Sequence, residues 1–65
     1  MPNNAGVYEV LAEAYMETGQ HEAAIFNYQK TIDMLRADST KNTKQWALDR
    51  MVDMEAIIER LEAEQ

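Results

Sequence analysis

The chain has 65 residues, a net charge of -6 at neutral pH and no cysteine. This length allows one small domain over residues 1–65, whose core supplies roughly 3 to 5 kcal/mol. Without cysteine, neither disulfides nor thiolate metal sites can stabilise it. No apolar run approaches the roughly 20 residues of a membrane span, and no signal peptide is evident. We therefore expect a cytoplasmic chain that has no membrane partner.

Charge is unevenly distributed along the chain. Residues 1–19 carry three acids and no base, residues 20–42 carry three of each, and residues 43–65 carry six acids and three bases. The two end segments therefore hold all of the negative net charge. Nucleic acid is a poor partner, because phosphate binding needs a basic surface. A basic peptide or protein surface fits this charge better.

Residues 5–18 have the periodicity of a helix, and Asn4, in the entry segment 2–4, can cap its first turn. At 100° per residue, apolar side chains fill a wide arc that we expect to face the core. These side chains are Val7, Tyr8, Leu11, Ala12, Ala14, Tyr15 and Met16, with Val10 at one margin. The charged residues Glu9, Glu13 and Glu17 recur every fourth position, so they form one row on the opposite face.

A second helix is predicted over residues 21–36, after a tight turn at residues 18–20. Gly19 suits this turn, since a residue just past a helix end often needs positive φ. The apolar face of the second helix consists of Ala24, Ile25, Tyr28, Thr31, Ile32 and Leu35. Two apolar faces joined by so short a turn must meet, which predicts an antiparallel helical hairpin.

A third helix is predicted from near Thr43 to about residue 63, after a polar linker over residues 37–42. Asn42 and Gln45 have the spacing of a capping box. The apolar seam consists of Ala47, Met51, Met54, Ile58 and Leu61, flanked by Trp46 and Ile57. Leu48 and Val52 widen it, which favours a helix lodged in the groove between the first two. Because the third helix is longer than the second, we expect about one turn at its end to lie uncovered.

The first two segments resemble the tetratricopeptide repeat. The residues that carry the resemblance are Tyr8, Leu11, Ala12, Ala14, Tyr15, Gly19, Ala24, Ile25, Tyr28, Gln29 and Lys30. It implies an all-α, three-helix fold, in which one repeat is closed by a longer capping helix. Departures are His21, Thr31 and Arg36, where the family favours an aromatic residue, an alanine and a proline. The chain would then be a fragment or terminal module of a longer protein.

The resemblance also implies a protein-interaction or scaffolding module. In this family the first helix of each repeat lines a groove that holds a ligand peptide, and Glu9, Glu13 and Glu17 lie on the matching face, with Met16 beside them. The alternative is a solvated face with no ligand. The family's clamp for carboxylate-ended tails uses lysine, arginine and asparagine on first helices, and residues 5–19 contain none of these.

Self-association is the second hypothesis. Phe26 lies about 100° from the buried stripe of its helix, so it is a candidate contact with another subunit or domain. Met34 lies beside it, and Ile57 and Leu61 lie in the expected uncovered turn. Homodimerisation through these residues would add burial to a small core. The repeat also resembles the lone C-terminal repeat of some bacterial hydrolases and esterases, whose catalytic residues would lie upstream.

Catalysis by this chain is not expected. It has one serine, one histidine, no cysteine and no glycine-rich phosphate loop, so nucleophile-plus-base and nucleotide-binding arrangements cannot be assembled. His21 has no neighbouring ligand at metal-binding spacing, and we expect it to pack on the apolar side of its helix. We therefore expect neither a cofactor nor a metal.

Overall fold

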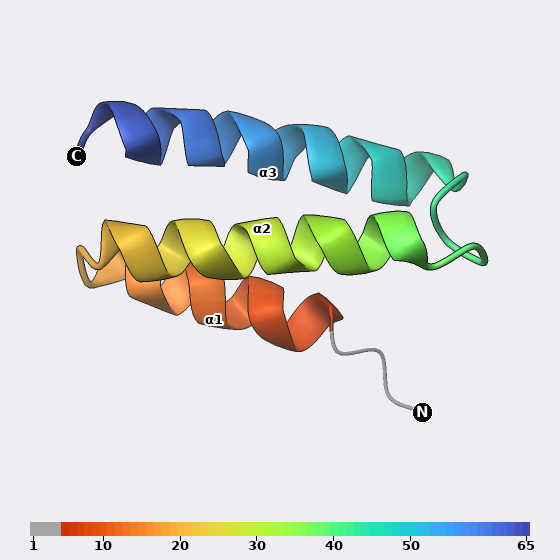
Figure 1. Cartoon of the computed structure of the whole chain (residues 1–65), viewed down its shortest axis with the longest axis horizontal. Coiled ribbons are helices and arrows are strands. Elements are labelled where there is room, and N and C mark those ends of the chain that lie inside the picture. Colours follow the sequence, from red (N-terminus) through yellow and green to blue (C-terminus); the bar gives the residue numbers. More distant parts are fainter. Residues whose placement is uncertain (1–4) are drawn as a thin grey trace.

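The computed structural model describes residues 5–65. It contains α1 (Ala5–Glu17), α2 (His21–Ala37) and α3 (Gln45–Ala63), and no strand is present in this part of the chain. The helix α2 lies between α1 and α3 and runs antiparallel to both (Figure 1). The predicted all-α fold, with a helical hairpin followed by a longer helix, is confirmed. The expected cap by Asn4 lies outside the described residues.

The turn between α1 and α2 is closed by backbone hydrogen bonds around Gly19. This glycine has a φ of 78°, in the left-handed region that side chains disfavour. The amide of Gln20 donates to the carbonyl of Tyr15 at 2.9 Å, and the amide of Gly19 donates to that of Met16 at 3.1 Å. This pair of bonds is the Schellman motif, which satisfies the carbonyls left free at a helix end. The predicted turn is therefore confirmed, with its physical cause.

The orientation of α1 about its own axis differs from the prediction. Ala5 and Ala12 are the residues of α1 buried against α2, whereas Val7, Val10 and Leu11 of the expected core arc are exposed. Alanine has a small side chain, so the two helix backbones can approach closely along this line. The apolar arc of α1 was too wide to define one buried face, and the helix turns the line of Ala5 and Ala12 inward.

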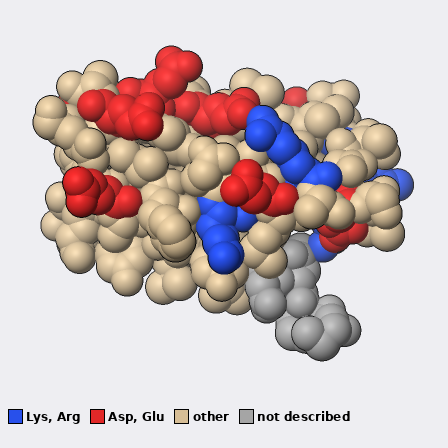
Figure 2. All heavy atoms as spheres, in the orientation of Figure 1, with Lys and Arg blue, Asp and Glu red and all other residues tan. Residues whose placement is uncertain are grey.

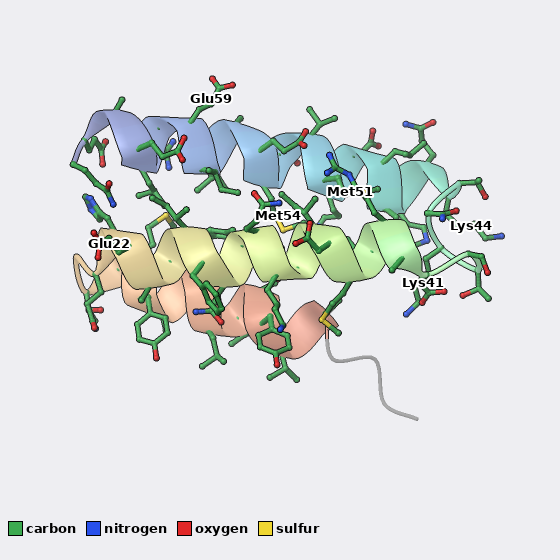
Figure 3. All side chains as sticks on the ribbon, in the orientation of Figure 1. Glu22, Lys41, Lys44, Met51, Met54 and Glu59 are labelled. Atoms are coloured by element: carbon green, nitrogen blue, oxygen red, sulfur yellow. The ribbon has the colours of Figure 1, made fainter. Side chains whose placement is uncertain are left out.

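The contact between α2 and α3 is built from larger side chains. Met51 and Met54 of α3 lie between the two helices (Figure 3). The buried apolar residues of α2 and α3 are Ala24, Tyr28, Ile32, Leu35, Ala47, Met51, Met54, Ile58 and Leu61. All nine belong to the predicted apolar faces, so the predicted seam of α3 is confirmed.

The start of α3 differs from the prediction in its capping. The helix begins at Gln45, and Lys44 at the N-cap makes no side-chain capping bond. The side-chain amide of Asn42 donates instead to the carbonyl of Arg36 at 2.9 Å. Asn42 therefore closes the end of α2 and does not form the expected capping box with Gln45.

The position of α3 is also different from the expected one. No α-carbon of α3 lies within 8 Å of one in α1, so α3 packs along α2 and is not lodged in a groove between the first two helices. Leu48 and Val52, which widened the predicted arc, are exposed as a consequence. Where α1 and α3 come together, they do so through side chains that reach over α2.

No uncovered turn is found at the end of α3. The helix has 19 residues against 17 in α2, a difference of about 3 Å at 1.5 Å per residue. His21 at the start of α2 lies 4.0 Å from the carboxylate of Glu64, so the two ends are level. Ile58 and Leu61 are buried there, and Ile57 is half-buried against the core. The expectation of an overhang was wrong because α2 is longer than predicted and α3 starts later.

Candidate protein-interaction site

The row of glutamates on α1 divides into one paired and two unpaired members. Glu9 forms an ion pair with Arg50 of α3, and its side chain is 15% exposed. Glu13 and Glu17 are exposed, and within residues 5–65 neither has an ion-pair partner. The row is therefore a solvated face only over its second half, which corrects the expectation that all three carboxylates lie free in water.

The pair between Glu9 and Arg50 joins the two outer helices. Glu9 accepts hydrogen bonds from the guanidinium, and this contact raises the pKa of Arg50 above its ordinary value. Arg50 itself is about half exposed. Because solvent screens the half-exposed guanidinium, the pair contributes little free energy and orients the two side chains more than it stabilises the fold.

Tyr28 of α2 lies beneath the glutamate row. The residue is 1% exposed, and within residues 5–65 its hydroxyl has no hydrogen-bond partner. No buried side-chain oxygen or nitrogen in the same range lacks a partner, so the hydroxyl oxygen must reach the surface. Burial raises the pKa of Tyr28, and nearby Glu13, Glu9 and Glu17 raise it further, while Arg60 lowers it. The hydroxyl oxygen therefore lies at the edge of the core, in a negative field.

Met16, the fourth residue of the predicted peptide site, is half-buried and packs against the core. It packs on the core side of α1, whereas Glu13 and Glu17 are exposed. Met16 can therefore contribute apolar surface only at the edge of a peptide site. Glu9, Glu13, Met16 and Glu17 stay a prediction as partner-binding residues.

The residues predicted for self-association do not form one surface. Phe26 is 65% exposed, as its position on the helix predicts. Met34 and Ile57 are half-buried against the core, and Leu61 is 2% exposed. Leu61 is thus part of the packing between α2 and α3 and offers nothing to a second molecule. The expectation that it lies uncovered was wrong, for the same reason as the overhang.

The outer face of α1 was missed by the sequence reasoning. Val7, Val10 and Leu11 are exposed, with Val10 at 64%, and together with Gly6 they line a hollow of about 480 Å³. A surface helix usually carries polar side chains on the face opposite the core. The missed signal was that α1 has apolar residues on nearly every side, so that burying one face must expose another.

Acidic side chains also gather over α3 on the face drawn in Figure 2. Glu59 points away from α2 there (Figure 3). His21, the single histidine, is half-buried at the start of α2. Among residues 5–65, no group of three or more histidine, aspartate or glutamate side chains could hold a metal ion.

None of the three described helices is both long and apolar enough to cross a membrane.

The fold and these surfaces define an all-α protein of three antiparallel helices, with an acidic row and an apolar outer face on its first helix. No family model matches the chain, and no curated protein or solved structure matches it either. The resemblance to the tetratricopeptide repeat therefore stays a prediction.

Proposed function

We propose that the chain is a protein-interaction module of the tetratricopeptide-repeat type that binds a basic peptide or basic protein surface along α1. The observation that carries this proposal is the pair of exposed carboxylates of Glu13 and Glu17, which have no ion-pair partner within residues 5–65 and lie near the hydroxyl of Tyr28. A lysine or arginine side chain placed there could donate hydrogen bonds to the carboxylates of Glu13 and Glu17 and to the hydroxyl oxygen of Tyr28. The net charge of -6 steers such a partner towards the chain.

The arrangement supports a cation more than any other ligand. Glu9 is already neutralised by Arg50, so the remaining negative field lies towards Glu13 and Glu17. An ammonium or guanidinium group bound beside Tyr28 would offset the repulsion between these carboxylates, which lie one helical turn apart. Hydrogen bonds between charged and neutral groups in such a place contribute about 1.5–3 kcal/mol.

The test is the affinity of a fluorescent peptide of alternating lysine and alanine. The double variant Glu13→Gln, Glu17→Gln leaves the pair of Glu9 with Arg50 intact, and we expect it to bind at least several-fold more weakly with a shallower salt dependence. A matched control, Glu59→Gln, Glu62→Gln, removes the same charge from exposed positions of α3. Equal losses in both double variants would mean that only net charge matters, and the proposed site would be rejected.

Tyr28→Phe supplies a second variant, since it removes the hydroxyl without changing the charge. We expect it to weaken the peptide by a few-fold and to leave the salt dependence as it is. An unchanged affinity would mean that Tyr28 is not part of the site and that only Glu13 and Glu17 form it.

The outer face of α1 favours a second candidate function, a self-associating module or one appended to a larger hydrolase or esterase. Exposed Val7, Val10 and Leu11 gain free energy when another surface covers them, at about 25 cal/mol per Å². Sedimentation equilibrium over a wide concentration range tests self-association. We expect Val10→Lys to abolish any dimer, and Phe26→Lys to abolish it only if the predicted contact at Phe26 is the correct one.

A further inference from the structure

A pocket of about 170 Å³ is lined by residues from the start of α1, the second half of α2 and the start of α3. Its lining residues are Ala5, Gly6, Glu9, Thr31, Leu35, Trp46 and Arg50. The pocket exists because α1 and α3 both pack on α2 while their backbones stay apart. The pocket shares only Glu9 with the predicted peptide site and only Gly6 with the hollow on the outer face of α1.

The size and walls of this pocket fit one six-membered ring. An engineered apolar cavity of about 150 Å³ in another protein binds benzene, so a volume of about 170 Å³ holds a ring with one small substituent. Leu35 and Ala5 form apolar walls, and Trp46 contributes an indole that is about half exposed. Aromatic rings prefer offset or edge-to-face contacts with one another, which the indole can provide.

The charges in the pocket favour an uncharged ligand. Glu9 and Arg50 neutralise each other, and a charged ligand would have to compete with that pair. A neutral ring leaves the pair intact and can stack on the planar guanidinium of Arg50.

Thr31 is the buried polar residue of the pocket lining, at 1% exposure. Its hydroxyl donates to the carbonyl of Asn27 at 2.9 Å and lies 3.5 Å from that of Ala5; both are acceptors, so the hydroxyl oxygen keeps its own capacity to accept a hydrogen bond. We propose that this pocket binds an uncharged aromatic ring with one hydrogen-bond donor, the chemistry of a phenol. The ring can belong to a free small molecule or to a tyrosine side chain of a partner. This proposal does not depend on the basic-peptide site.

Trp46 is the only tryptophan of the chain, so its fluorescence reports on the pocket directly. Phenol should change the emission saturably and bind about two- to tenfold tighter than toluene, which has the same size but no donor, as one net hydrogen bond predicts. Thr31→Val should remove this preference. The control Phe26→Ala alters an exposed aromatic residue on the outer side of α2 and should retain it.

Several results would overturn the proposal. Linear quenching without saturation would mean that no site exists. Equal affinities for phenol and toluene in the unaltered protein would mean that the pocket does not recognise a hydrogen-bond donor on the ligand. If Thr31→Val does not fold, amide chemical shifts of the unaltered protein decide the matter: phenol must shift Gly6, Thr31 and Leu35, and shifts elsewhere reject the site. N-acetyltyrosinamide binding tighter than phenol supports a partner's tyrosine, and weaker binding supports a small molecule.

Discussion

The two helix contacts of this protein are built on different principles. α1 contributes only Ala5 and Ala12 to the buried core, and it reaches α2 through a three-residue turn. α3 contributes Met51, Met54 and Leu61 among others, and it follows a longer loop. The first contact depends on close approach of two backbones, and the second depends on filling a volume. Enlarging a buried side chain should therefore destabilise the contact between α1 and α2, and truncating one should destabilise the contact between α2 and α3.

The largest expected effect is at the contact between α2 and α3. Leu61→Ala removes a nearly fully buried side chain and leaves a cavity, which costs about 2–5 kcal/mol. Because the core supplies roughly 3 to 5 kcal/mol, we expect most of the variant to be unfolded at 25 °C. Circular dichroism during urea denaturation measures this. Met54→Leu keeps the side-chain volume and should cost less than about 1.5 kcal/mol. A loss of stability as large as that of Leu61→Ala would mean that this contact does not depend on filling a volume.

The contact between α1 and α2 should respond to enlargement. Ala12→Leu forces added methyl groups between two close backbones, and overpacking of this kind costs about 1–3 kcal/mol. Ala14→Leu makes the same change at an exposed position of the same helix and should stay within about 0.5 kcal/mol. Urea midpoints of the two variants that coincide would contradict close packing at Ala12.

A smaller effect is expected where α1 and α3 meet through side chains. A double-mutant cycle with Glu9→Gln and Arg50→Gln should give a coupling free energy of about 0.2–1 kcal/mol, which falls as salt is added. Glu17→Gln paired with Arg50→Gln is the control, since Glu17 has no ion pair in the described residues and is not among the carboxylates that raise the pKa of Arg50, and it should give almost no coupling. A coupling for Glu17 as large as that for Glu9 would show that Arg50 has no specific partner.

The smallest effect is a pH dependence in the loop. Hydrogen bonds from the side chain and amide of Thr40 lower the pKa of Asp38 below 3.8, and Lys41 lowers it further. The stabilisation from ionised Asp38 is therefore complete above pH 3.8 and is lost as pH falls through the lowered pKa. Asp38→Asn should be less stable than the unaltered protein at neutral pH. We expect the difference to vanish at the acid end, and one that persists there would exclude this linkage.

Much of the fold could be predicted from local signals. Gly19 and the helical periodicity of the apolar residues on both sides of it place the turn to within a residue. The third helix has only one apolar face, at Met51, Met54 and Ile58, because its opposite side is charged. The capping of α3 could not be predicted in this way. Asn42 had two acceptable partners, the amides of the next helix and the carbonyl of Arg36, and the path of the loop decided between them.

The candidate site was predictable only in part. The spacing of Glu13 and Glu17 was enough to place both on the surface. The same spacing could not show that Glu9 would meet Arg50, because their contact depends on how α3 lies across α2. Val7 and Val10 were expected in the core, since a helix wheel treats every apolar residue alike and ignores side-chain size.

The sequence by itself determined three helices, their approximate ends and the buried seam of α3, because hydrophobic periodicity and turn chemistry act within a few residues. The tertiary structure alone decided which face of α1 turns inward, where Arg50 finds its carboxylate and why a pocket remains beside Trp46. The physical reason is that α1 is apolar almost all round. Its orientation is then set by how closely Ala5 and Ala12 let two backbones approach, which depends on the packing partner and not on the pattern of the helix itself.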